Sequence, residues 1–235
     1  MTVRLRIVEP EWLDQLSPDD PRAIKCRRDL KRANTLMMHP FIMARTLRQH
    51  WSGDSPRVLV DLGSGDGTFV LRVAQRLSRH WRNVHAILLD QRAVVSEETR
   101  AGFAALNWTV EPVRTHVLDF FNQLRTEPVD IVTANLFLHH LQDQELERLL
   151  AQAASSTKLF VACELQRTKL VREIGRMQWL IGGGDVICYD GVVSTRASFR
   201  GQEISALWPR QDGWDLFENE LGPMAHVFVA RRRAG

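Results

Sequence analysis

The sequence is poor in the residue types that several protein classes require. Its 235 residues include three cysteines, and Cys26, Cys163 and Cys188 are far apart along the chain. An odd number of widely spaced cysteines argues against a disulfide framework or a zinc site, and indicates free thiols in a reducing compartment. No apolar run approaches the roughly 20 residues that span a bilayer. The N-terminus also lacks the apolar core of a signal peptide, so we expect a cytoplasmic protein without membrane insertion.

Lysine is scarce as well, so the net charge of +3 at pH 7 rests almost entirely on arginine. The densest basic run lies within residues 22–32, where apolar residues and aspartates alternate with the basic ones. This pattern is typical of the solvent-exposed face of an amphipathic helix, and we favour that interpretation over a nucleic-acid-binding surface. The length suits one α/β domain with a small helical addition.

The most informative segment runs from Val58 to Phe69. Its apolar, β-branched start predicts a buried parallel strand. A glycine-rich turn ends this strand, and a helix over 67–77 follows the turn. Strand, glycine turn and helix together bring backbone N–H groups up to a ligand. The glycines follow the pattern G-x-G-x-G, and Asp61 and Asp66 flank them. Acids at these positions suit a ligand with a cationic group and would repel a pyrophosphate.

Strand and helix patterns alternate beyond this turn. Strands are predicted at 57–62, 84–90, 110–118, 129–135 and 158–164, and helices at 94–106 and 143–154. Such alternation predicts an α/β fold with a Rossmann-like, doubly wound sheet whose ligand lies at the carboxyl ends of the strands. Two more strands, 213–220 and 224–232, are joined by a short reversal and predict an antiparallel C-terminal hairpin. The expected sheet therefore has seven strands.

Helices are also predicted outside this alternating region. Asp20 followed by Pro21 is a helix start, and helices are expected at 21–34 and 40–51. We therefore predict an N-terminal helical extension over residues 1–52 and a main domain over 53–235. A further helix is predicted at 198–207.

In order along the chain, these motifs resemble those of class I S-adenosylmethionine (SAM) dependent methyltransferases of the small-molecule type. The resemblance implies that residues 53–235 bind SAM, that the product is S-adenosylhomocysteine, and that residues 1–52 form a lid over the active site. It implies that the segment 166–210 builds the substrate pocket. Segments around residues 12–30 and 194–199 resemble a group of uncharacterised bacterial methyltransferases, which implies a small, aromatic or polyketide-derived acceptor.

The resemblance also implies which residues hold the cofactor. Asp90 ends the strand after the glycine loop, where an acid can accept both hydroxyls of a ribose; the alternative is that it caps the helix expected from Val94. Asp119 and Phe120 are implied to contact the adenine, and Asn135 the amino-acid part. The expected cofactor residues are Asp61, Gly63, Ser64, Gly65, Asp66, Gly67, Asp90, Gln91, Asp119, Phe120, Asn135 and Leu136.

Candidate catalytic residues follow the fourth predicted strand. His139 and His140 lie where many small-molecule methyltransferases carry a similar L-H-H-L run, and a histidine near neutrality can take a proton from an O–H or N–H nucleophile. We prefer His139, which is nearer the strand end. The alternative is that one histidine packs structurally and the other caps the next helix. Tyr189 with Asp190 could bind or deprotonate a phenol, or form a β-turn. No metal ion is expected.

The predicted function is therefore SAM-dependent methyl transfer to oxygen, rather than nitrogen or carbon, of a small apolar or aromatic molecule by a monomer or homodimer. Two alternatives stay open. An NAD-dependent oxidoreductase also carries an acid at the position of Asp90, although Asp61, Asp66 and the missing third glycine of the dinucleotide pattern argue against it. A SAM-binding partner protein without transferase activity has the same cofactor motifs. An RNA methyltransferase is disfavoured, since no basic RNA-binding domain is appended, and we expect no nucleic-acid partner.

Overall fold

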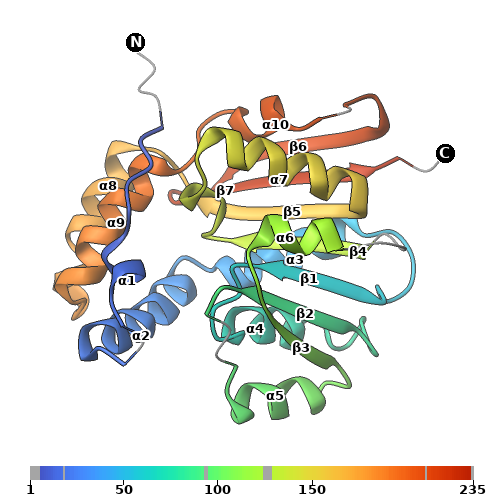
Figure 1. Ribbon diagram of the computed structural model, residues 1–235, viewed down its shortest axis with the longest axis horizontal. Helices are drawn as coiled ribbons and strands as arrows, with labels where there is room; N and C mark the ends of the chain where they lie inside the picture. Colours follow the sequence, from blue (N-terminus) through green and yellow to red (C-terminus); the bar gives the residue numbers. More distant parts are fainter. Residues whose placement is uncertain (1–5, 18, 93–94, 124–128, 210, 234–235) are drawn as a thin grey trace.

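A seven-stranded sheet forms the centre of the protein. The computed structural model describes residues 6–17, 19–92, 95–123, 129–209 and 211–233, and within them the strand order is β3-β2-β1-β4-β5-β7-β6 (Figure 1). Strands β1 to β5 are parallel, and β7 is antiparallel to both β5 and β6. The predicted Rossmann-like sheet with an antiparallel C-terminal hairpin is confirmed.

The strands are β1 (Val58–Leu62), β2 (His85–Asp90), β3 (Thr109–Arg114), β4 (Val129–Asn135), β5 (Thr157–Leu165), β6 (Trp214–Leu221) and β7 (Ala225–Arg232). The helices before β1 are α1 (Trp12–Gln15), α2 (Pro21–Leu36) and α3 (His39–His50). Those between β1 and β5 are α4 (Thr68–Leu77), α5 (Glu97–Ala104), α6 (Val117–Gln123), the 3₁₀ turn η1 (Leu138–His140) and α7 (Asp143–Ser156). Those after β5 are α8 (Lys169–Arg176), η2 (Gln178–Ile181), α9 (Asp185–Ala197), α10 (Glu203–Leu207) and η3 (Gln211–Gly213). Of the described helices, none is long and apolar enough to cross a membrane.

Apolar side chains fill both faces of the sheet. Val60 and Leu62 of β1 belong to a buried cluster with α6, α7 and α10, whereas Leu59 faces a second cluster with α3, α4 and α5. Successive side chains of a strand point to opposite faces, so an unbroken apolar strand is buried on both sides. This explains why β1, β4 and β5 are mostly apolar, with residues of this kind on both faces.

Several elements differ from the sequence prediction by more than a residue or two. The strand predicted at 110–118 ends at Arg114, because Val117 and Phe121 are spaced for one face of a helix and both enter the core as part of α6. The helix expected from Val94, a residue outside the described ranges, begins at Glu97 behind the N-cap Ser96. The helix predicted at 198–207 is only α10, and residues 185–197 form α9 instead of a turn.

The N-terminal helices divide between two parts of the molecule. Met43, Ala44 and Leu47 of α3 are buried in the second core cluster, so α3 covers a face of the sheet. Helices α1 and α2 instead pack with α8 and α9 in a separate group beside the sheet (Figure 1). Met38, with a φ of 58°, makes the change of direction between α2 and α3.

We expect Gly63→Ala to lower the free energy of unfolding by about 2–4 kcal/mol, from left-handed strain and overpacking. Gly63 has a φ of 67°, and a Cβ there would lie 2.2 Å from Cδ2 of Phe137. Gly213→Ala is the matched control, since its Cβ would meet no atom within 4 Å. Urea unfolding of both variants measures the difference, and equal stabilities would contradict this account of the loop.

Candidate active site

The glycine loop connects β1 to α4 at the carboxyl edge of the sheet. Gly63, Gly65 and Gly67 have φ angles of 67°, 56° and 75°, a left-handed region that side chains other than glycine rarely adopt. The Ser64 N–H donates to the carbonyl of Leu89 at 3.0 Å, which joins the loop to β2. The Ser64 hydroxyl is buried and has no hydrogen-bond partner among the described residues.

Asp90 connects the end of β2 to this loop. Its carboxylate accepts the Gly65 N–H at 2.9 Å through one oxygen and the Arg92 N–H at 2.7 Å through the other. The alternative prediction, that Asp90 caps the following helix, is wrong, because Ser96 accepts from the Thr99 N–H at the start of α5. The neighbouring Gln91 contributes its carbonyl to Arg114, at 3.0 Å.

The two acids that flank the glycines have opposite environments. Asp61 is buried within β1, where the Thr133 hydroxyl donates to it at 2.6 Å. Burial, together with the charge of Asp90, raises the pKa of Asp61 to about 7. Burial also acts to raise the pKa of Asp66, but hydrogen bonds from Lys31 and Thr68 outweigh it and the pKa is lowered. Lys31 belongs to α2, so this ion pair joins the N-terminal helices to the loop.

Asn135 ends β4 and faces the N-terminal helices. Its Oδ1 accepts from Nδ1 of His39 at 2.9 Å, and its Nδ2 donates to Oδ1 of Asn34 at 3.1 Å. His39 is fully buried, which lowers its pKa, and its Nε2 has no partner among the described residues. Leu136 follows with a φ of 49° and donates its N–H to the carbonyl of Cys163. Sequence reasoning missed His39 because a histidine at a helix start carries no distinctive signal.

Asp119 and Phe120 lie in the first two turns of α6 and not at a strand end, as the sequence analysis expected. Asp119 is exposed, whereas Phe120 is half-buried against the first core cluster. Their assignment to the adenine stays a prediction.

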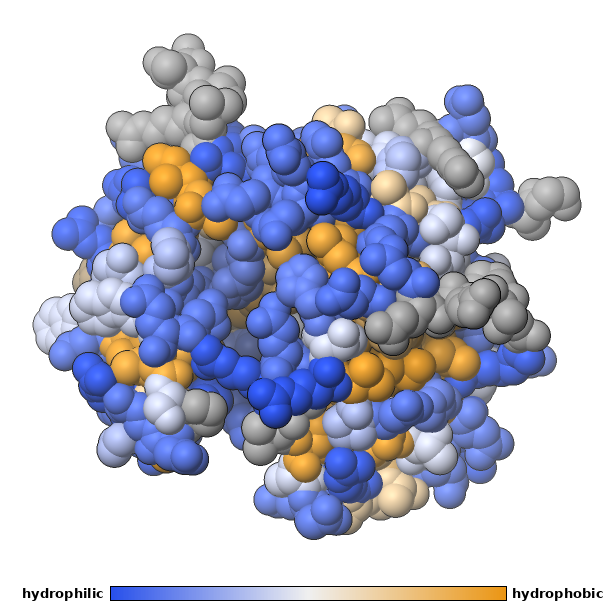
Figure 2. Space-filling model, viewed as in Figure 1, coloured by the Kyte–Doolittle hydropathy of each residue, from blue (hydrophilic) through white to orange (hydrophobic). Residues whose placement is uncertain are grey.

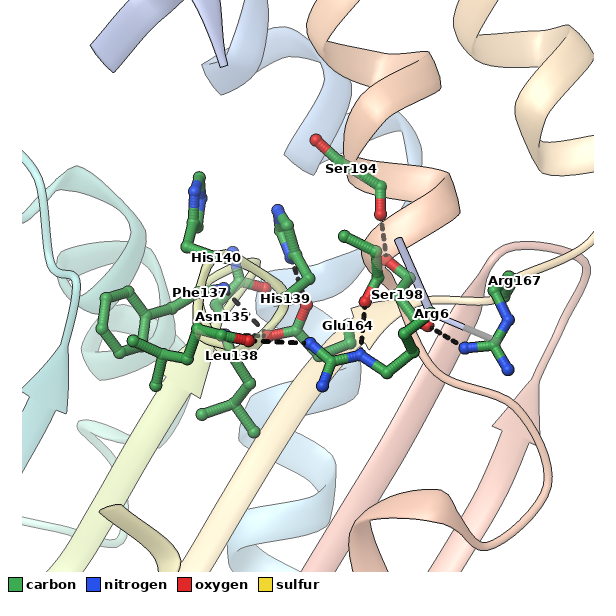
Figure 3. Close-up of polar contacts among 12 residues, drawn as sticks. Arg6, Asn135, Phe137, Leu138, His139, His140, Glu164, Arg167, Ser194 and Ser198 are labelled. Carbon is green, nitrogen blue, oxygen red and sulfur yellow. Dashed lines mark hydrogen bonds and ion pairs between the residues drawn. The ribbon is translucent and has the colours of Figure 1, made fainter. Parts of the chain in front are cut away.

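His139 is held between two carboxylates (Figure 3). Its Nδ1 lies 2.6 Å from Oε2 of Glu164, and its Nε2 lies 3.4 Å from Oε1 of Glu11. Burial acts to lower the pKa of His139, but Glu164 and Glu11 outweigh it and raise the pKa to about 10. The ring is therefore protonated at neutral pH. Glu164 is a polar residue at the end of an otherwise apolar strand, a signal that sequence reasoning did not use.

His140 stacks on His139 with ring centroids 4.4 Å apart. Its pKa is lowered by burial and by the charge of His139, so the ring is neutral. Its Nδ1 lies 3.6 Å from Oδ2 of Asp14. Neither histidine caps α7, because Gln142 and Glu145 form a capping box there. The alternative that one of the two histidines caps the next helix is therefore wrong.

Tyr189 and Asp190 lie within α9, so the β-turn alternative is also wrong. The Tyr189 ring stacks on Trp12 with centroids 4.1 Å apart. Asp190 accepts the Trp12 and Leu13 N–H groups at 2.8 and 3.1 Å, which holds the start of α1. Burial, with the charge of Glu11, raises the pKa of Asp190 to about 6.

These groups gather along one edge of the sheet. The glycine loop, the end of β2, the end of β4 and η1 face the helical group of α1, α2, α8 and α9 (Figure 1). Figure 2 shows the surface hollowed between this helical group and the sheet. The site therefore has a cofactor half at the glycine loop and a second half at η1 and α1.

Comparison with known proteins agrees with this geometry. Residues 59–159 match a family model described as a methyltransferase domain. This segment is therefore similar to a methyltransferase domain. The matched range runs from β1 to the start of β5 and includes the glycine loop, Asp90 and η1. No match was found among curated proteins.

Solved structures resemble the fold of this chain at low sequence identity. An O-methyltransferase family protein from Burkholderia thailandensis is 17% identical, with a TM-score of 0.55 over 88% of this chain and 62% of its own. The mitomycin 7-O-methyltransferase MmcR is 18% identical, with a TM-score of 0.56 over 93% and 60%. RosA of Streptomyces davawensis, an N,N-8-amino-8-demethyl-D-riboflavin dimethyltransferase, is 16% identical, with a TM-score of 0.56 over 95% and 62%. The chain thus spans about three fifths of their lengths, and the likeness is one of fold.

We expect Asp61→Asn to stabilise the protein by about 1–4 kcal/mol at pH 8, because burial of the charged carboxylate opposes folding once Asp61 is ionised. The folded-state pKa of Asp61 is raised, so its contribution is fully favourable only below the unfolded pKa near 3.8 and is lost as the pH rises to about 7. Asparagine can still accept from Thr133.

Urea unfolding of both proteins between pH 5 and 8 tests this. The variant's advantage should grow with pH up to about 7 and then level off. An advantage that does not change with pH would mean that folding does not raise the pKa of Asp61.

Proposed function

We propose that this chain transfers a methyl group from SAM to an oxygen of a small apolar or aromatic molecule and releases S-adenosylhomocysteine. The observation that carries the proposal is one edge of the sheet at which the left-handed glycine loop and Asp90 lie beside the His139–His140 pair. A sulfonium methyl group needs little covalent help from the protein, so positioning and exclusion of water account for most of the catalysis.

The residues around the loop fit SAM. Asp61 is a buried carboxylate that accepts a hydrogen bond from the Thr133 hydroxyl, so an ammonium group nearby would stabilise its charged form. Ser64 offers a buried hydroxyl without a partner among the described residues. A Cβ at Gly65 would meet nothing within 4 Å, so the loop surface is open there. The Asp90 carboxylate stands beside that opening, where ribose hydroxyls could replace its backbone donors.

The same residues disfavour NAD. A pyrophosphate at this loop would lie near the carboxylate of Asp61, and its negative charge would be repelled. Asp66 is paired with Lys31, so Asp61 carries most of this argument.

The second half of the site suits a small aromatic acceptor. Trp12 and Tyr189 form a stacked and partly exposed aromatic pair, and Phe137 lies beside His140. Two of the compared structures bear names of small-molecule methyltransferases, one acting on oxygen and one on an amino group. These names support a small acceptor but do not choose between oxygen and nitrogen. We favour oxygen because the histidines of η1 suit the removal of a proton from a hydroxyl group.

Proton removal belongs to the His139–His140 pair in this proposal. His139 is protonated, and its two ring nitrogens face Glu164 and Glu11. It therefore pairs with these carboxylates and is a poor proton acceptor. His140 is neutral and half-buried, which makes it the better acceptor. The geometry thus supports His140 over the sequence-based preference for His139.

We predict that SAM and S-adenosylhomocysteine bind with calorimetrically measurable heat and that NAD does not. Asp90→Ala should weaken SAM binding by about 1.5–3 kcal/mol, the range for losing a charged hydrogen-bond partner. Asp20→Ala is the control, since Asp20 caps α2 through the Arg22 N–H and also pairs with the Arg22 side chain. That control should lose stability and keep SAM affinity. NAD binding without a response to SAM would overturn the proposal.

A screen of small phenols with SAM, read by product mass, identifies an acceptor for the rate test. His140→Gln should then lower the methyl-transfer rate by about 10²–10⁴-fold, the usual contribution of a general base. His139→Gln should lower both the rate and the stability, because Glu11 and Glu164 would keep their charges without the cation between them. His85→Gln, at an exposed site on β2, is the control. Wild-type turnover by His140→Gln would remove the pair from proton transfer.

A further inference from the structure

Three metal-ligating side chains converge beside η1. Glu11, His139 and His140 each offer one ligand atom, and these atoms lie within 4.8 Å of one another. Figure 3 shows the two imidazole rings rising from η1 on the same side. Glu11 is the residue before α1, so the cluster connects α1 to η1.

The separation between two of the three ligand atoms suits an ion. Nε2 of His139 and Oε1 of Glu11 are 3.4 Å apart. A charge-assisted N–H···O bond is shorter, about 2.7–2.9 Å. Two ligand atoms at about 2.0–2.1 Å from a tetrahedral zinc ion lie about 3.3–3.4 Å from each other. The observed separation therefore matches an edge of a coordination tetrahedron better than a direct hydrogen bond.

Outer groups orient each of the three side chains. Glu164 accepts at Nδ1 of His139, which directs Nε2 toward Glu11. The Ser194 hydroxyl donates to Oε1 of Glu11, and Asp14 lies beside Nδ1 of His140. A carboxylate on the far nitrogen of a histidine ligand is the usual support of a metal site, because it fixes the ring and raises its basicity.

We propose that Glu11, His139 and His140 bind one divalent transition-metal ion, and that the donor set favours zinc. Two histidines and one glutamate are a ligand set of catalytic zinc sites, which keep a fourth position open. The site is partly accessible, since the His140 side chain is 31% exposed while that of His139 is 4% exposed.

The open position gives the acceptor a place to bind, an extension that rests on the proposed methyl transfer. An acceptor hydroxyl bound to the ion would be more acidic. Its proton goes to water, its oxygen forms the bond to the methyl carbon as the carbon–sulfur bond breaks, and the electron pair stays on the sulfur of S-adenosylhomocysteine. In this extension the ion displaces the Nε2 proton of His139 and takes the place of His140 in activating the hydroxyl. The two histidines are then ligands and not bases, and the acceptor class is a hydroxylated aromatic molecule that can ligate a metal.

The test uses the full chain, freed of metal with a chelator and titrated with Zn²⁺ by calorimetry and with Co²⁺ by visible absorption. One ion per chain is expected, with the intense absorption of four-coordinate Co²⁺. Glu11→Gln and His140→Gln should each weaken binding by at least about 100-fold, the upper end of the loss seen for outer-sphere partners. His85→Gln is the matched control, because His85 and Glu111 form an exposed histidine–glutamate pair 3.0 Å apart.

Loss of binding in the two site variants, with binding kept in His85→Gln, would support the proposal. No binding by the wild type, unchanged binding by Glu11→Gln, or loss of binding in His85→Gln would overturn it. SAM titrations of the same samples separate the two proposals. A protein that binds SAM and not Zn²⁺ removes only the metal site, whereas one that binds Zn²⁺ and not SAM removes only the proposed cofactor.

Discussion

The buried carboxylate of Glu164 is the interaction on which the second half of the site depends. One of its oxygens accepts the Phe137 and Leu138 N–H groups, at 2.9 and 2.7 Å, and the other faces His139. The carboxylate therefore sets the backbone of η1 and the direction of the histidine together. Glu164 is fully buried, so it cannot lose these donors without leaving a charge unpaired in the core. An acid at the end of β5 thus fixes the geometry of a loop that follows β4.

Residues ahead of β1 complete both halves of the site. Lys31 pairs with Asp66 at the glycine loop, while Asn34 and His39 hold Asn135 at the end of β4. Glu11 then approaches His139. The N-terminal extension contributes polar contacts as well as cover, so it is part of the site's electrostatics. A lid made of apolar side chains alone would leave Asp66 and His139 without these partners.

The sequence predicts the parts of this structure that depend on local pattern. The glycine loop, the strand ending at Asp90 and the C-terminal hairpin follow from apolar runs and turn residues, and each is present. Val117 falls within the strand predicted at 110–118, because a short apolar run fits both periods. Only the packing of Val117 and Phe121 in the core decides for the helix. The contact of Asp190 with the N–H groups of α1 depends on two segments that are distant in sequence. No local pattern encodes such a contact, which explains why the environments of the η1 histidines were not predictable.

The Glu11–Ser194 contact has a consequence for the order in which the molecule assembles. These residues are 183 positions apart in the chain. Bringing them together costs the loop-closure entropy of nearly the whole polypeptide, and that entropy is recovered only once the sheet between them has formed. Formation of this contact is therefore expected to depend on the sheet being in place. During synthesis, Glu11 emerges well before the helix that carries Ser194, so the two can meet only after α9 has been made.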